Sequence, residues 1–156
     1  MAGDEDRLAP DRDLTVLLLA AGARLPVEPV SSSDYRSGVC NIGPAEIARR
    51  RRTGITMTVV TLVMLAIVAM ADAPTPVRLV VFFPAAVAAS GFLQASLRFC
   101  AGFGWLGVFN FDRVGMTQAV ESAEARRRDR GMAIRIGLAS ALVGGIVAAV
   151  AAVLPA

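Results

Sequence analysis

Three long runs without a charged residue constrain what this chain can fold into. They cover residues 53–71, 79–97 and 136–156, which is 19, 19 and 21 residues. A helix needs roughly 20 apolar residues to cross the hydrocarbon core of a bilayer. Backbone groups in lipid must bond to one another, which favours helix despite the β-branched residues in these runs. The sequence therefore predicts three transmembrane helices, at about 53–71, 79–97 and 136–155.

Helix signals flank the first two predicted spans. The linker at 72–78 is too short for a domain, so these two helices should form an antiparallel hairpin. Before the hairpin, Asn41 is a candidate helix cap, Pro44 suits a first turn and Glu46 favours the positive end of a helix dipole. These residues predict an interfacial helix at about 44–52 that leads into the first span.

The loop before the third span also carries helix signals. Thr117 is a candidate cap, and Glu124 is spaced to pair with Arg127 and Arg128 on one helix face. We expect a helix here that runs through Gly131 into the third span. The predicted fold is thus an all-α membrane protein in which interfacial helices accompany three spans.

The arginines predict how the spans are oriented. Four arginines directly precede the first span and seven lie in the loop at 98–135, whereas the linker between the first two spans has only Arg78. Basic loops tend to stay on the cytoplasmic side of a membrane. We therefore expect a multi-pass protein of the cell (inner) membrane, with the N-terminus and the 98–135 loop in the cytoplasm and the C-terminus outside.

The same arginines are candidate contacts for membrane lipid. Each basic residue near an anionic membrane surface contributes about 1 kcal/mol of attraction. A basic excess beside apolar runs is typical of a membrane surface and not of a nucleic-acid partner. The candidate surface residues are Arg49, Arg50, Arg51, Arg52, Arg126, Arg127 and Arg128.

Residues 1–38 differ from the rest of the chain, since they hold seven carboxylates and four arginines. The apolar stretch at 14–23 is too short to span a membrane and follows no basic segment, so it does not resemble a secretory signal. We expect a largely flexible cytoplasmic arm at 1–38, followed by a membrane domain at 39–156. Both a short surface helix at 13–23 and a wholly disordered tail fit the surrounding prolines and serines.

The composition excludes several kinds of chemistry. The chain has no histidine, so histidine-ligated haem or zinc and serine–histidine hydrolysis cannot be built from it alone. No ionisable residue lies inside the three uncharged runs, although proton pumps and ion-coupled carriers usually need one. We expect no cofactor, no bound metal and no enzymatic activity.

Two cysteines form the one long-range constellation in the sequence. Cys40 precedes the first span and Cys100 follows the second, so a hairpin should bring both to the same face. One interpretation is a thiol pair that switches by redox or, across a homodimer, holds a soft metal or an iron–sulfur cluster. Neighbouring arginines would then lower the pKa of Cys40. The alternative is two structural thiols in a reducing compartment.

Aromatic and small residues suggest two kinds of contact. Five aromatic residues interleaved with glycines at 98–111 predict a re-entrant or surface-lying turn that packs near Cys40 and sits in the membrane interface. These candidate interface aromatics are Phe99, Phe103, Trp105, Phe109 and Phe111.

In the third span, Gly137, Ala141 and Gly145 recur every four residues, as do Gly144 and Ala148. Such stripes let another helix approach closely. The sequence leaves open whether that helix belongs to this chain or to a partner.

Two short motifs flank the hairpin. Asn41, Gly43 and the arginines at 49–52 precede its first helix, and Cys100, Phe103, Leu106 and Gly107 follow its second. In these motifs the hairpin resembles a family of small two-helix inner-membrane proteins of unknown function, whose membrane unit also occurs fused to rhodanese domains. Ala101 stands where that family has a proline, and Phe103 where it has a tyrosine. The resemblance covers about residues 40–108. It implies a membrane fold unit and a dimer, with no established reaction.

Together these features predict a non-catalytic integral membrane protein, acting as an accessory or assembly subunit of a larger membrane complex or as a homo-oligomer. Its expected partners are membrane lipid and other membrane subunits or further copies of itself. One alternative is a thiol-dependent redox or sulfur- and metal-handling protein that uses Cys40 and Cys100. A second alternative is a small transporter.

Overall fold

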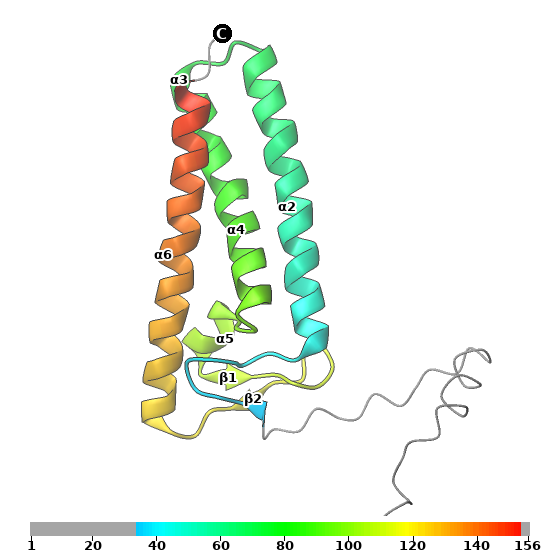
Figure 1. Ribbon diagram of the computed structural model, residues 1–156, viewed down its shortest axis with the longest axis vertical. Helices are drawn as coiled ribbons and strands as arrows, with labels where there is room; N and C mark the ends of the chain where they lie inside the picture. The colour runs from blue at the N-terminus through cyan, green and yellow to red at the C-terminus, as the bar shows by residue number, and fades with distance from the viewer. Residues whose placement is uncertain (1–33, 154–156) are drawn as a thin grey trace, which may run out of the picture.

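A computed structural model describes residues 34–153, and three long helices dominate it (Figure 1). The predictions for residues 1–33, which include most of the arm and the helix at 13–23, lie outside the described residues, as do residues 154–156. The elements in chain order are α2 (Pro44–Met70), α3 (Thr75–Arg78), the 3-10 turn η2 (Leu79–Val81), α4 (Phe82–Ser96), α5 (Ala101–Leu106), β1 (Val108–Phe109), β2 (Gln118–Ala119) and α6 (Ala123–Val153).

All three predicted spans are confirmed as helices long and apolar enough to cross a membrane. They are Pro44–Met70, the consecutive pieces Thr75–Ser96, and Ala123–Val153, with 27, 22 and 31 residues. The middle span begins irregularly because Pro84 has no N–H and its ring displaces the carbonyl of the preceding turn, which favours 3-10 geometry at Leu79–Val81. The molecule is therefore consistent with an all-α, multi-pass membrane architecture.

Both predicted interfacial helices are continuous with their spans. Pro44 occupies the first turn of α2, and the helix passes through the arginine run without a break, as expected. In α6 the helix passes through Gly131, also as expected, but it begins at Ala123 and not near Thr117. Ser122 caps it instead, with its Oγ 3.4 Å from the Ala125 amide.

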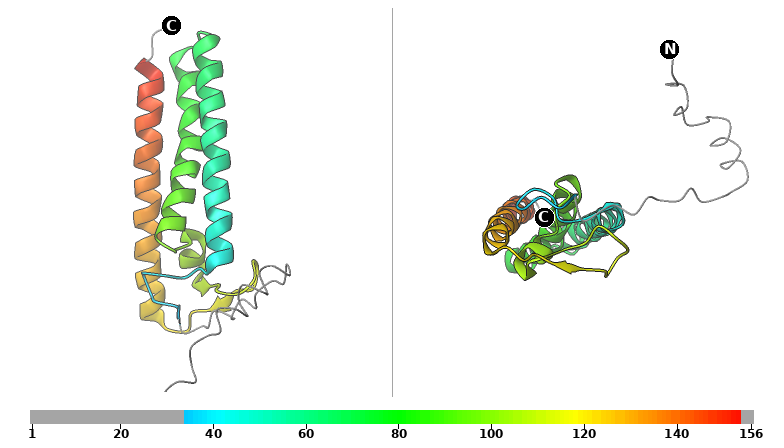
Figure 2. Two further views of the ribbon diagram at one scale, coloured as in Figure 1. Left: turned by 45° about the vertical axis from the view of Figure 1, so that its right-hand side comes forward. Right: turned by 90° about the horizontal axis from the view of Figure 1, so that it is seen from below.

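The predicted hairpin of α2 and α4 is present, and α4 lies between α2 and α6 (Figures 1 and 2). The α2–α4 crossing depends on two glycines. A Cβ atom on Gly91 would lie 2.6 Å from the backbone nitrogen of Gly54, so Gly91 does not tolerate a side chain without moving the helices apart. A Cβ atom on Gly54 would lie 3.1 Å from the ring of Phe92, which would have to shift. Helices that cross through glycine gain close backbone packing, which replaces the hydrophobic effect inside a bilayer.

One of the two small-residue stripes of α6 packs inside the bundle. Gly144 and Ala148 are buried, and a Cβ on Gly144 would lie 2.8 Å from the Cβ of Ala86 on α4. The other stripe points elsewhere: nothing described lies within 4 Å of a Cβ built on Gly137 or Gly145, and Ala141 is exposed.

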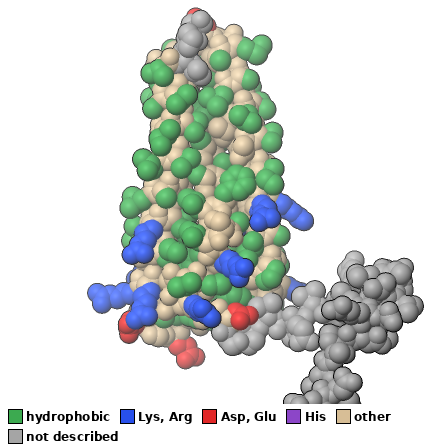
Figure 3. Space-filling view, in the orientation of Figure 1, with side chains coloured by type: hydrophobic (Ala, Val, Ile, Leu, Met, Phe, Trp, Pro, Cys, Tyr) green, Lys and Arg blue, Asp and Glu red, His purple; other side chains and the backbone are tan. Residues whose placement is uncertain are grey.

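The surface of the bundle divides into an apolar body and a basic end. Large hydrophobic side chains are exposed along all three long helices, as at Leu62 (60%), Phe83 (66%) and Leu138 (67%). In Figure 3 hydrophobic side chains cover the body, while arginines gather at the end where α2 begins. We call this end the base. Such a surface suits lipid around the body and water or headgroups around the base.

In the turn at the opposite end, between α2 and α3, the one arginine is paired with a nearby carboxylate. Asp72, two residues after the end of α2, adopts the left-handed conformation with φ 48°. The Arg78 guanidinium is buried at 6% exposure, contacts the Asp72 carboxylate at 3.2 Å and donates to the Ala73 carbonyl at 2.6 Å. The single arginine at this end is therefore tied to the turn.

The loop at 107–122 differs from an all-α expectation. β1 and β2 form a two-residue antiparallel pair, with Val108 opposite Ala119 and Phe109 opposite Gln118. Gly107 connects α5 to β1 and adopts φ +69°, a conformation that favours glycine. This short hairpin folds the loop back over the base and does not extend it as helix.

The crossing glycines generate a direct prediction. Gly91→Ala should destabilise the bundle by about 1–3 kcal/mol, because the new Cβ meets the backbone of α2. Gly137→Ala is the matched control, since open space surrounds that position and alanine favours helix. Thermal unfolding in a neutral detergent measures both. Equal stability of the two variants would contradict the glycine-mediated crossing.

Candidate functional site

The base is where the sequence-predicted site residues meet, and Asn41 organises it. Its side-chain amide donates to the carbonyl of Cys100 at 3.1 Å, and its Oδ1 accepts the Cys100 amide at 2.7 Å. Asn41 is fully buried, and α2 has no side-chain cap; Gly43 stands at its cap position. The prediction that Asn41 caps this helix is therefore wrong, because its amide pairs with the backbone between α4 and α5.

Asn110 links the loop at 107–122 to the same segment. The backbone amide of Asn110 donates to the backbone carbonyl of Asn41 at 3.0 Å, and the backbone carbonyl of Asn110 accepts the Gly43 amide at 2.8 Å. Gly43 must be small here, since a Cβ would lie 2.7 Å from the Phe111 carbonyl. The segment before α2 is thus held between the α4–α5 corner and this loop.

Asp129 fixes the described end of the predicted arm, residues 34–38, to α6. Its carboxylate accepts the Tyr35 hydroxyl at 2.8 Å and the Gly38 amide at 2.6 Å, and it is fully buried. Tyr35 also stacks on Phe109, with ring centroids 4.7 Å apart. Burial, and then the hydrogen bond to Asp129, raise the pKa of Tyr35, so the neutral phenol is favoured.

Glu46 forms a buried acid–base cluster with the arginines that follow it. Its carboxylate is 1% exposed, with Oε2 3.7 Å from Arg50 Nη2 and Oε1 3.8 Å from Arg49 Nη1. Neither oxygen has a hydrogen-bond partner among the described residues. Arg50 also donates to the sulfur of Cys100 at 3.0 Å. Glu46 does lie in the first turn of α2, as predicted, and in addition it forms ion pairs with two of the four arginines.

Cys40 and Cys100 lie at the same end, both as free thiols in different surroundings. Cys100 is buried and contacts Arg50, whereas Cys40 is half-buried against Phe109 and Phe111. Burial raises the pKa of Cys40 and outweighs the opposing effect of Arg98. The expected lowering of this pKa is therefore wrong. Within residues 34–153 no group of three or more Cys, Asp or Glu side chains is arranged to hold a metal ion.

Three of the five candidate interface aromatics are core residues. Phe99 is fully buried against Ala133 and Ile136 of α6. Phe109 and Phe111 form a second cluster with Val120, which confirms that this turn packs near Cys40. Trp105 is 56% exposed and Phe103 is half-buried, so these two alone keep the exposure that an interfacial residue needs.

The basic candidates divide between ion pairs and open surface. Arg128 pairs with Glu124 at 2.6 Å, four residues away as predicted, while no pair joins Glu124 to Arg127. Arg126 lies against Gly107, and a Cβ built on Gly107 would come within 2.7 Å of the Arg126 Cδ.

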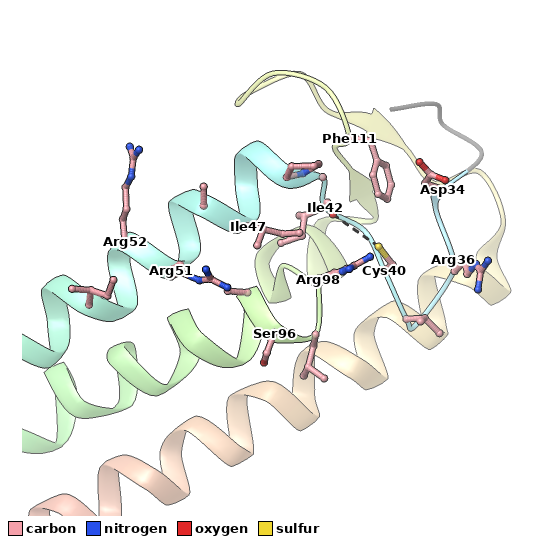
Figure 4. Close-up of a pocket in the computed structure, with 17 residues that line it drawn as sticks. Asp34, Arg36, Cys40, Ile42, Ile47, Arg51, Arg52, Ser96, Arg98 and Phe111 are labelled. Carbon is pink, nitrogen blue, oxygen red and sulfur yellow. Dashed lines mark hydrogen bonds between the residues drawn. The ribbon is translucent and has the colours of Figure 1, made fainter. Parts of the chain in front are cut away.

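The arginines of α2 divide in the same way. Arg49 and Arg50 face Glu46, whereas Arg51 and Arg52 line an open pocket beside Cys40 (Figure 4).

Comparison with known protein families, with curated proteins and with solved structures finds no match to this chain. The resemblance to the two-helix membrane family therefore rests on its motif residues alone. In the structure the Asn41 and Cys100 ends of those two motifs are joined by the paired hydrogen bonds described above.

The Asp129 contacts predict a specific loss of order. Asp129→Asn should cost about 1.5–3 kcal/mol and release residues 34–40, because an amide cannot replace both charged acceptor contacts. Tyr35→Phe removes one of these hydrogen bonds and should cost less. Hydrogen exchange at the Gly38 amide reports the release. Unchanged protection in Asp129→Asn would contradict the anchoring role.

The thiol surroundings predict slow alkylation. With its pKa raised, Cys40 should react with iodoacetamide more slowly at pH 8 than a free thiol, and its rate should keep rising above the ordinary thiol range. Cys100, at 2% exposure, should react only on unfolding. Mass spectrometry after timed alkylation measures both, with denatured protein as control. Rapid reaction of Cys40 at pH 7 would overturn the burial argument.

Proposed function

We propose that this chain is a non-catalytic membrane subunit that acts by packing against another transmembrane helix, from a partner protein or a second copy of itself. The observation that carries the proposal is the outward stripe of α6. A Cβ at Gly137 or Gly145 would meet no described atom, whereas Gly54, Gly91 and Gly144 all serve crossings within the bundle. Glycine inside a helix costs stability unless close packing repays it.

The distribution of arginines supports an orientation for this subunit. Of the thirteen arginines in residues 34–153, twelve lie at the base and one, Arg78, lies at the far turn. Arg78 is also paired with Asp72. By the positive-inside rule we place the base in the cytoplasm and the C-terminal end of α6 outside, in the inner membrane of the cell.

A thiol function is the second candidate because of one contact. The Arg50 guanidinium lies 3.0 Å from the Cys100 sulfur, and a cationic neighbour of this kind is typical of reactive cysteines. Burial of Cys100 and the raised pKa of Cys40 weigh against a reactive pair. A disulfide between Cys40 and Cys100 in protein alkylated directly in membranes would favour this candidate over the packing subunit.

The packing proposal predicts the result of a substitution pair. Gly145→Leu should dissociate the assembly without loss of thermal stability, because its side chain enters open space in the single chain. Ala66→Leu on the exposed side of α2 is the control for added bulk and should leave the assembly intact. Mass measurement of the full chain in mild detergent follows both variants. A wild-type protein that is monomeric and free of stoichiometric partners would contradict the proposal.

A further inference from the structure

An open pocket of about 1100 Å³ lies at the base between α2, the segment before it and the α4–α5 corner (Figure 4). Its polar rim comes from three separate parts of the chain. Arg51 and Arg52 lie on α2, Arg98 follows α4, and Arg36 lies in the segment that Asp129 holds in place. Asp34 is the one carboxylate among the described residues that line it.

The four arginines of this pocket outnumber its one described carboxylate, Asp34, so the pocket keeps an excess of positive charge. None of its four arginines forms an ion pair with another residue of 34–153. Arg49, Arg50 and Arg128 at the same end do have carboxylate partners. Figure 4 shows Arg51 and Arg98 on two sides of the pocket, while Arg52 points away from it. Guanidinium groups in excess over carboxylates are a site for phosphate oxygens, which they bind with charge-assisted hydrogen bonds.

Arg98 is at a backbone position where glycine is usual. It follows α4 in the left-handed region, with φ 52°, and its carbonyl accepts the amides of Asn41 and Ile42. Those two bonds need only the backbone, so glycine would make them with less strain. The arginine side chain is therefore not required for the turn, and strain of this kind concentrates at functional positions.

A second, apolar cavity lies farther along the same helix faces. Arg51 and Ile55 line the pocket on α2, and Thr58 and Leu62, the next turns of the same helix face, line this second cavity of about 310 Å³. On α4, Ala95 lines the pocket, and Phe92 and Ala88 line the second cavity. The lining of this second cavity is almost entirely apolar, and its remaining walls are residues of α2, α4 and α6.

We infer that this composite site binds an anionic phospholipid. The headgroup phosphate lies between Arg51 and Arg98, and an acyl chain lies along α2 and α4 toward the second, apolar cavity. The arginines match the charge of the phosphate, and the apolar cavity farther along the same helix faces distinguishes a lipid from a soluble phosphate. The basic end is also the level at which headgroups meet a chain whose apolar body lies in lipid.

The test measures lipid retained by the full chain after delipidation in a neutral detergent. Phosphatidylglycerol, phosphatidylcholine and inorganic phosphate are added separately to wild type, Arg51→Gln, Arg98→Gly and the control Arg127→Gln. Arg127 is one of the exposed arginines expected to attract headgroups in general, but it lies outside the pocket. Its variant therefore loses the same charge without changing the proposed site. Native mass spectrometry counts bound lipid. The unfolding temperature without ligand checks the fold, and the unfolding temperature with each ligand measures stabilisation.

Wild type and Arg127→Gln should each retain one phosphatidylglycerol in preference to phosphatidylcholine. Arg51→Gln and Arg98→Gly should bind it about tenfold more weakly, as expected for loss of one charge-assisted contact. Arg98→Gly should unfold at the wild-type temperature or above it. Three results would overturn the assignment: an equal loss in Arg127→Gln, equal retention of phosphatidylcholine, or stabilisation by inorganic phosphate as large as by lipid.

Discussion

The paired hydrogen bonds between the Asn41 side chain and the Cys100 backbone hold the base together. The chain must turn sharply between α4 and α5, which leaves an N–H and a C=O that a buried corner has to satisfy. An asparagine side chain offers an N–H donor and a C=O acceptor side by side, and Asn41 uses them to meet the carbonyl and the amide of Cys100 at 3.1 and 2.7 Å. With Asn41 in place, its own backbone is positioned to pair with Asn110, and the loop at 107–122 closes over the end of the bundle.

The spans were predictable because exclusion of charge is a property of the sequence itself. A run of about 20 uncharged residues has few alternatives to a membrane helix, and within residues 34–153 each of the three runs forms helix over most of its length. Which small residues face inward was not predictable. Gly137 and Gly144 stand in stripes with the same four-residue spacing, and only the path of α4 decides that Gly144 meets Ala86 while Gly137 faces outward.

Most of the candidate site depends on contacts between distant residues. Asp129 stands among arginines, a pattern typical of a solvated helix face, yet it is buried because Tyr35 and Gly38 come to it from more than 90 positions away. The aromatics at 99–111 show the same limit. A phenylalanine suits an interface or a core equally well, and the fold of the loop places Phe99, Phe109 and Phe111 in the interior. The spacing of residues along the sequence does not tell that Asp129 meets Tyr35 and Gly38, nor that these three phenylalanines are buried.

The contacts of Asp129 also impose an order on synthesis. Tyr35 and Gly38 leave the ribosome long before their partner, which follows them by 94 and 91 residues. The hairpin of α2 and α4 uses nearer neighbours and can enter the membrane while the third span is still being made. The base cannot close until α6 has begun to emerge. Emergence of the first turns of α6 is therefore the step that finishes the first part of the described chain.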